Sequence, residues 1–133
     1  MLFLDTNAYS ALANGQKGIV CLIQRESGLV LALPVIAELR YGFLKGSRQN
    51  KNEEMLHRFL SQPQVEIALP TLDTAKLYAD FQLHCIKKGR VLSHNDLWIA
   101  AIAKQNDGTL VTYDRDFEAL NSIFSEKLII LNN

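Results

Sequence analysis

Two patterns of apolar residues alternate along the chain. Short runs that are almost entirely apolar predict buried strands, and between them apolar residues recur every three or four positions, which predicts amphipathic helices. The expected strands are residues 2–4, 29–33, 65–69, 109–112 and 128–131. The expected helices are residues 8–13, 17–25, 34–44, 52–60, 71–87, 95–105 and 116–120. Strands that alternate with helices predict an α/β fold with a mainly parallel sheet of about five strands.

Two of the expected helices have distinctive faces. Residues 71–87 form the longest one, and its apolar positions line a single face. These positions are Leu72, Ala75, Ala79, Leu83 and Ile86. The helix 95–105 is broadly apolar and rich in small residues, which suits close packing on a sheet.

Length and composition narrow the classes of protein. A chain of 133 residues, 48% of them hydrophobic, predicts one domain covering residues 1–133 with a real core. The 14 basic and 14 acidic side chains cancel, so no bulk positive charge drives non-specific nucleic-acid binding, although a nucleic-acid partner is still allowed. No signal or membrane-spanning segment is expected, and Cys21 and Cys85 lack a paired spacing. We therefore expect a cytoplasmic protein with free, buried thiols and no membrane partner.

Acidic residues recur at positions that a parallel sheet would bring to one edge. Asp5 follows the first strand, Asp114 and Asp116 follow the fourth, and Glu38 and Asp96 lie in the first turns of helices. Function in open α/β sheets gathers at the carboxyl ends of the strands. Clustered carboxylates repel one another unless a cation neutralises them, and oxygen ligands favour Mg²⁺ or Mn²⁺. The pattern therefore predicts a divalent-metal site.

Each acidic residue also has an ordinary structural explanation. Asp96 lies three residues after Ser93, which is the spacing of a helix cap, and Asp5 could equally serve a turn or a cap. The two aspartates of the last segment flank a turn, where Asp is common. Glu38 is harder to explain in this way, because its apolar neighbours imply a largely buried helix.

The order and spacing of four motifs give a more specific signal. The motifs are residues 4–7 (LDTN), 37–42 (AELRYG), 92–101 (LSHNDLWIAA) and 110–117 (LVTYDRDF). They cover nearly the whole chain, and together they resemble the PIN-domain nucleases and, within these, the VapC-type toxins of bacterial toxin–antitoxin pairs. The resemblance implies a three-layer PIN-like fold, a metal-dependent endoribonuclease and a homodimer inhibited by a separate antitoxin, with which it could form a hetero-oligomer.

The resemblance also assigns roles to the acidic residues. Asp5, Glu38 and Asp96 match the family's acidic triad, while Asp114 and Asp116 both remain candidates for the fourth position. One or two Mg²⁺ or Mn²⁺ ions held by Asp5, Asp96 and Asp114 or Asp116 would activate water for attack on an RNA phosphodiester. Glu38 could be a ligand or a general base. Side chains expected to hold the carboxylates in place are Thr6, Asn7, Ser93 and Thr112.

Cationic and aromatic residues near the motifs are candidate RNA contacts. Arg40 and Arg115 lie closest to the acidic motifs and are expected to meet phosphates. Trp98 and Tyr41 could stack on bases but are more commonly core residues in apolar helices. The three histidines share no ligand spacing, which argues against a histidine-based nuclease.

Two alternatives remain open from the residues alone. A strand that ends in Asp also opens the site of aspartate-based phosphatases and phosphoacceptor domains. Those of the haloacid-dehalogenase type carry a second Asp two residues later, where this chain has Asn7. The other alternative is a binding module that keeps the PIN fold without catalysis.

Overall fold

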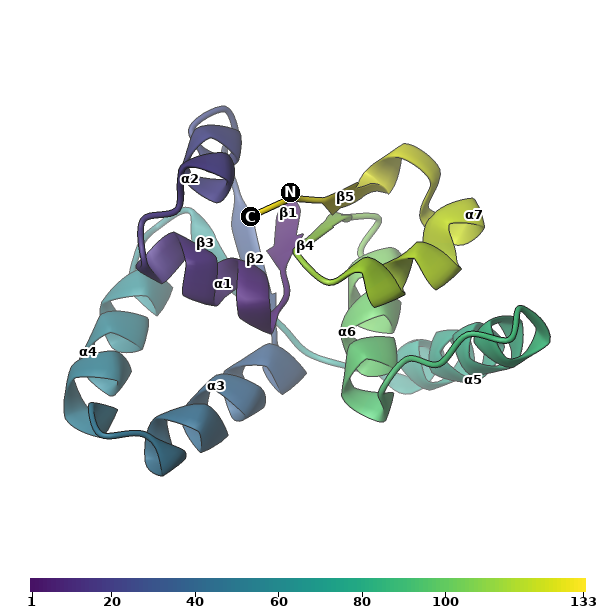
Figure 1. The fold of residues 1–133 in the computed structure, drawn as a ribbon, viewed down its shortest axis with the longest axis horizontal. Coiled ribbons are helices and arrows are strands. Elements are labelled where there is room, and N and C mark those ends of the chain that lie inside the picture. Colours follow the sequence, from purple (N-terminus) through teal and green to yellow (C-terminus); the bar gives the residue numbers. More distant parts are fainter.

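The central sheet has five parallel strands in the order β3-β2-β1-β4-β5 (Figure 1). The computed structural model describes residues 1–133. Every pairing between neighbouring strands is parallel, as the alternation of strands and helices predicts. The strands are β1 (Leu2–Leu4), β2 (Leu29–Ala32), β3 (Val65–Ala68), β4 (Thr109–Thr112) and β5 (Leu128–Ile130).

Seven α-helices and two 3₁₀ segments connect the strands. The α-helices are α1 (Thr6–Ala13), α2 (Lys17–Ile23), α3 (Leu33–Lys45), α4 (Gln49–Leu60), α5 (Leu72–Lys87), α6 (His94–Gln105) and α7 (Asn121–Phe124). The 3₁₀ segments are η1 (Arg115–Leu120) and η2 (Ser125–Lys127). The sequence pattern predicts the first six helices and the turn near η1, but it does not predict α7. Leu33 begins α3 and does not extend β2 as expected, because Pro34 in the first turn favours helical geometry there.

The chain adds β2 and β3 on one side of β1 and then crosses back to add β4 and β5 on the other side. This change of direction in the strand order produces three layers. Connections α1 to α4 serve the strands on one side of β1, and connections α5 to α7 serve those on the other side. Because parallel crossovers are right-handed, the two groups of helices cover opposite faces. Figure 1 shows the two groups on either side of the strands, with α3 and α4 reaching away from the sheet as a two-helix arm. The three-layer PIN-like architecture is confirmed.

Both groups of helices contribute to the core, and α6 contributes more buried residues than any other helix. Strands β1 and β2 are buried throughout, and Ala100, Ala101 and Ala103 of α6 have no exposed surface. The small residues of α6 let it approach the sheet closely, as expected. Gly108, just before β4, has no room for a side chain because a Cβ there would meet the ring of Phe3. The backbone packs directly on this ring.

The long helix α5 is oriented differently from what its sequence suggests. Its buried residues are Thr74, Phe81 and Cys85, whereas the predicted apolar face points to solvent. Leu72 at the start of that face is 91% exposed. Cys21 is exposed as well, contrary to the expectation for a buried thiol. None of the helices is both long and apolar enough to span a membrane.

Candidate active site

Asp5 lies at the carboxyl end of β1 and is almost fully buried, with 3% of its surface exposed. It caps α1, because its Oδ1 accepts a hydrogen bond of 2.9 Å from the Ala8 N–H. Its Oδ2 accepts a second bond, of 2.5 Å, from the Thr112 hydroxyl at the end of β4. Asp5 therefore fulfils the ordinary capping role and also joins two neighbouring strand ends.

The ends of β1 and β4 are held together by two further polar contacts. The Asn7 side-chain oxygen accepts a 2.9 Å bond from the Tyr113 N–H. The Thr112 hydroxyl, which donates to Asp5, accepts a 2.9 Å bond from the Asp114 N–H. Asn7 and Thr112 thus connect the segment after β1 to the segment after β4.

Glu38 is brought to the same edge by α3. The Thr6 hydroxyl donates a 2.9 Å hydrogen bond to Glu38 Oε1, which connects the start of α1 to α3. Glu38 is half-buried, and its neighbour Ala37 is exposed, so the helix is less buried here than its sequence implies. The carboxylate therefore has access to both the protein and the solvent.

Asp96 lies in the first turn of α6 and is repelled electrostatically by other acidic residues of the cluster. Its N–H donates a 3.1 Å bond to Ser93 Oγ, so Ser93 caps the helix as the spacing predicts. Burial raises the pKa of Asp96 to about 6, opposed by a hydrogen bond with Ser93 and reinforced by repulsion from Glu38, Asp114 and Asp116. The capping pattern and the acidic cluster coexist at this helix start.

Asp5 has the most strongly altered ionisation of the group. Burial raises its pKa to about 7, although the hydrogen bonds from Thr112 and Ala8 favour the charged form. Repulsion from Asp96 and Asp114 raises this pKa further. The acidic segments, far apart in sequence, therefore converge closely enough for their charges to act on one another.

The two aspartates after β4 differ in their surroundings. Asp114 Oδ1 accepts a 2.9 Å bond from the Asp116 N–H and caps η1, as expected for a turn aspartate. The charge of Asp114 acts on both Asp5 and Asp96, whereas that of Asp116 acts on Asp96. Asp114 thus lies nearer the centre of the cluster.

The donor set suits a hard divalent cation in chemistry and charge. It consists of carboxylates alone, and burial together with repulsion between these carboxylates raises the pKa values of Asp5 and Asp96. No three acidic, histidine or cysteine side chains are arranged as a preformed metal-binding group. The protein therefore provides carboxylate ligands at one edge of the sheet. One oxygen of Asp5 accepts a hydrogen bond from Thr112, and one oxygen of Glu38 accepts a hydrogen bond from Thr6.

The two arginines expected to contact RNA are both paired with protein groups. Arg40 forms a 2.9 Å ion pair with Glu53 and so links α3 to α4. Arg115 lies 3.6 Å from Glu118 and donates a 2.7 Å bond to Asn132. Both arginines remain largely exposed on the protein surface.

The candidate aromatic residues are placed differently from one another. Tyr41 is 62% exposed beneath Lys45 and does not lie in the core. Trp98 is half-buried and stacks on Tyr78 with ring centroids 4.7 Å apart, and Tyr78 also hydrogen-bonds His94. Sequence spacing gives no sign of this cluster, because it depends on how α5 packs against α6.

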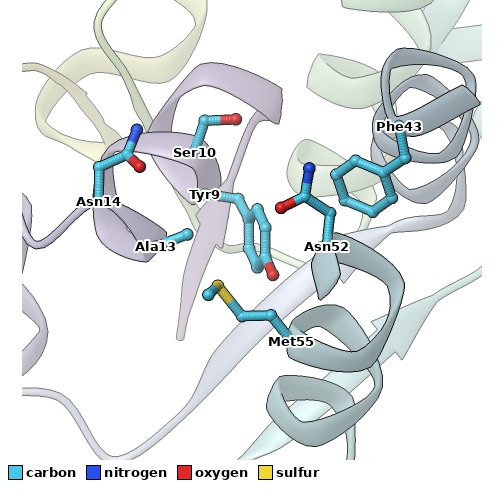
Figure 2. Close-up of a pocket in the computed structure, with 7 residues that line it drawn as sticks. All are labelled: Tyr9, Ser10, Ala13, Asn14, Phe43, Asn52 and Met55. Carbon is cyan, nitrogen blue, oxygen red and sulfur yellow. The ribbon is translucent and has the colours of Figure 1, made fainter. Parts of the chain in front are cut away.

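A hollow of about 170 Å³ separates the helical arm from α1 (Figure 2). Figure 2 shows Tyr9 of α1 directed towards Met55 and Asn52 of α4, with Phe43 of α3 beside them. The lining residues are Tyr9, Ser10, Ala13, Asn14, Phe43, Asn52 and Met55. The carboxylates line none of the surface hollows. The first hollow lies between α1 and the arm, and the same helices α1 and α3 carry the Thr6–Glu38 contact of the acidic edge.

Comparisons with known proteins agree with this architecture. The PIN domain model matches residues 2–122. Ribonuclease VapC5 from Mycobacterium tuberculosis is 30% identical over 126 residues, which cover 95% of this chain and 92% of the relative. Ribonuclease VapC2 from Rickettsia felis is 28% identical over 106 residues, 79% of this chain and 78% of the relative.

Solved structures show the same similarity in three dimensions. The crystal structure of VapBC2 from Rickettsia felis bound to a promoter DNA fragment superimposes with a TM-score of 0.78 at 27% identity. The alignment covers 99% of this chain and 98% of the matched chain. The family model and the VapC5 relative both align with most of the chain, so this chain belongs to the PIN domain family.

Proposed function

We propose that this protein is a metal-dependent endoribonuclease that acts as the toxin of a toxin–antitoxin pair in the cytoplasm. The observation that carries the proposal is the convergence of five carboxylates at one sheet edge, where burial, reinforced by repulsion from neighbouring carboxylates, raises the pKa values of Asp5 and Asp96. Relatives named ribonucleases, aligned over most of the chain, support RNA as the substrate. Family membership also favours a nuclease over an aspartate-based phosphatase.

Asp5, Asp96 and Asp114 are the best candidates to hold Mg²⁺ or Mn²⁺. Asp116 is the alternative fourth ligand, but its charge acts on fewer members of the cluster. A bound divalent cation would lower the pKa of a water molecule and neutralise charge that develops on the phosphodiester.

The protein's own residues keep the acidic groups ready for this chemistry. Thr112 fixes the orientation of Asp5 through its hydroxyl, and Thr6 fixes Glu38. Because one Glu38 oxygen is held by Thr6, the carboxylate is oriented to accept a proton from a water molecule. We assign Glu38 this positioning or general-base role, with Arg40 and Arg115 as surface contacts for the RNA backbone once their ion pairs open.

Cleavage by purified protein tests the proposal directly. Wild type should cut labelled RNA internally with Mg²⁺ or Mn²⁺ and lose this activity in excess EDTA. Asp5→Asn and Asp96→Asn should reduce cleavage by at least about 100-fold, in line with loss of charge at a metal-assisted site. Asp73→Asn, which alters an exposed aspartate on α5, is the matched control and should cleave normally. Equal cleavage by all variants would show that the acidic cluster does not take part in catalysis.

The hollow between α1 and the helical arm is the surface that we assign to an antitoxin segment. VapBC complexes are among the similar solved structures, which supports a protein partner for this chain. The hollow offers apolar rings and side-chain amides between α1 and the helical arm. Because α1 and α3 also carry Thr6 and Glu38, we expect an occupant to restrict access to the carboxylates as well. Such a partner could assemble with one chain or with a homodimer.

Two neighbouring residues allow a matched test of this surface. Phe43 lines the hollow, whereas Leu44 is 64% exposed on the same helix and lies outside its lining. Phe43→Glu should weaken capture of the antitoxin encoded beside this gene and restore growth arrest in its presence. Leu44→Glu should leave both unchanged. The assignment fails if the two variants bind the antitoxin equally well.

A further inference from the structure

The outer end of the helical arm, where α3 turns into α4, carries positive charge that nothing in the chain neutralises (Figure 1). Residues 39–52 contain four basic residues and no acidic one, although acidic and basic residues balance over the whole chain. One of the four, Arg40, forms an ion pair with α4. Lys45, Arg48 and Lys51 are exposed and belong to none of the ion pairs of the structure. An exposed excess of cations attracts polyanions.

Helix stability does not explain these cations. Arg48 immediately precedes α4 and Lys51 lies in its first turn, which has no acidic residue. Positive charge at the start of a helix opposes the helix dipole and lowers stability. The cations at the end of α5 differ, since Lys87 and Lys88 lie where positive charge complements the dipole. Arg48 and Lys51 therefore need an explanation outside their own helix.

The surface between these cations is polar. A hollow of about 490 Å³ lies at the turn of the arm, and residues 46–51 line it. None of these six residues is hydrophobic, whereas four of the seven residues that line the hollow assigned to the antitoxin are hydrophobic. Arginine, lysine, serine, asparagine and glutamine side chains are common contacts for nucleic-acid phosphates. This lining therefore fits a phosphate backbone better than the apolar side chains of a protein partner.

One side of α3 connects this end of the arm to the acidic edge. At 100° per residue, Tyr41 and Lys45 lie within about 60° of Glu38 around the helix axis. At 1.5 Å per residue, they lie about 4.5 and 10.5 Å further along it. Gly42 lies on the same side, and nothing is within 4 Å of the position that a Cβ would take there. The rest of the chain thus leaves this side of α3 open from the acidic edge to the turn of the arm.

Tyr41 provides an aromatic surface on this open side. Its side chain is 62% exposed, and the Lys45 ammonium lies 4.7 Å from the centre of its ring. Sites for single-stranded nucleic acids combine such rings, on which bases stack, with cations that follow the backbone. Tyr41 and the neighbouring cations supply both components within one surface.

We propose that Tyr41, Lys45, Arg48 and Lys51, here called the arm-tip surface, bind a single-stranded segment of the RNA substrate a few nucleotides from the cleaved bond. The inference deepens the proposed function, on which it rests for RNA as the substrate. The three cations contact phosphates, and Tyr41 stacks on a base. Phe43 of the antitoxin hollow lies about 160° around α3 from Lys45, so the two surfaces face different sides of the helix.

Fluorescence anisotropy with a labelled single-stranded RNA of about 20 nucleotides tests the surface, in EDTA to prevent metal-dependent cleavage. Two phosphate contacts to a single strand together favour binding about 25-fold at about 0.1 M salt relative to about 1 M. Arg48→Gln/Lys51→Gln should therefore bind about 25-fold more weakly than wild type at about 0.1 M KCl. The slope of log K against log salt concentration should become shallower by about 1.4.

A matched control removes the same two residue types elsewhere. Lys17 and Arg25 are exposed, form no ion pair and lie beside the two ends of α2. Figure 1 shows α2 close to the two chain termini and away from the turn of the arm. Lys17→Gln/Arg25→Gln should bind RNA like wild type, with the same salt dependence.

Two further readouts separate binding from folding. Arg48→Gln/Lys51→Gln should keep or raise the midpoint of urea unfolding, because it removes cations from the start of α4. Tyr41→Ala should weaken RNA binding about 10-fold, whereas Tyr41→Phe keeps the ring and should change it less than about 2-fold. For an RNA that wild type cleaves, Arg48→Gln/Lys51→Gln should raise KM at least about 10-fold and leave kcat within about 2-fold, since the arm-tip surface does not touch the cleaved bond.

Three results would overturn the proposal. The first is RNA binding by Arg48→Gln/Lys51→Gln that is as tight as that of the control. The second is a loss of affinity for duplex DNA of the same sequence with RNA binding intact, which would assign the surface to DNA. The third is a loss of antitoxin capture with RNA binding intact, which would assign the surface to the protein partner.

The proposed function is judged separately on the same samples. A wild type that cleaves no RNA, but whose RNA binding is lost in Arg48→Gln/Lys51→Gln, would remove the nuclease and support the RNA-binding surface. Normal cleavage with equal KM in wild type and in this variant would remove the surface and leave the catalytic assignment intact.

Discussion

Replacing Asp5 with asparagine should stabilise the metal-free protein at alkaline pH. Asp5 is 3% exposed, and its pKa is raised from 3.8 to about 7, chiefly by burial. The folded chain therefore binds a proton more tightly than the unfolded chain. The resulting stabilisation is fully present below about pH 3.8 and is lost as the pH rises to about 7. A neutral amide at this position removes the cost of ionisation.

The size of the effect follows from the two pKa values. The difference between 3.8 and about 7, at 1.36 kcal/mol per pH unit, corresponds to about 4 kcal/mol at pH 8 and about 1.5 kcal/mol at pH 5. In the Asp5→Asn variant the new amide nitrogen cannot accept the Thr112 hydroxyl bond, which costs about 1 kcal/mol. Asp5→Asn should therefore gain about 3 kcal/mol at pH 8, or roughly 10 °C in Tm, and less than about 1 kcal/mol at pH 5.

Thermal and urea unfolding in EDTA at the two pH values measure this gain. Glu66→Gln is the control, because Glu66 is exposed on β3 and its replacement should change stability by less than about 0.5 kcal/mol at either pH. An Asp5→Asn variant no more stable than wild type at pH 8 would refute the reasoning. A gain of equal size at both pH values would show that ionisation of Asp5 is not its cause.

Three further predictions concern the same region and the core beneath it. Thr112→Val removes the hydroxyl shared by Asp5 and the Asp114 N–H, so urea unfolding should show a loss of about 1–3 kcal/mol, and an unchanged midpoint would contradict the bracing role. Gly108→Ala should lower stability by about 1–3 kcal/mol, because the new methyl group meets the buried Phe3 ring, and an unaltered Tm would mean that the ring can move aside. Mn²⁺ at about 100 times its dissociation constant should raise the free energy of unfolding of wild type at pH 8 by about 2.7 kcal/mol and leave that of Asp5→Asn nearly unchanged. An equal increase in both proteins would show that Asp5 is not a metal ligand.

The fold could be predicted from sequence where one pattern has one structural meaning. Continuous apolar runs predicted all five strands, and their alternation with helices predicted the parallel sheet. The convergence of the acidic residues follows as well, because Asp5 comes directly after β1, Asp114 comes two residues after β4, and these two strands pair with each other. Capping and clustering do not exclude each other, because Asp5 caps α1 and Asp96 lies in the turn that Ser93 caps, and both carry charge in the acidic cluster.

Other features depend on contacts that sequence spacing does not contain. The apolar face of α5 was evident, but the helix packs through Phe81 and Cys85, and the choice between two apolar sides is made by the tertiary fit. The ion pair of Arg40 with Glu53 depends on how α3 turns into α4. Exposure of Ala37 beside Glu38 likewise reflects the position of the helical arm.

The acidic edge as the catalytic centre for RNA cleavage is tested most directly inside cells. RNA ends are sequenced after brief expression of wild type, Asp96→Asn and the control Asp73→Asn, with each protein measured at equal abundance. We expect a discrete set of new internal ends with wild type and with Asp73→Asn, and none above background with Asp96→Asn. The same new ends in all three samples, or no new ends in any of them, would contradict the account.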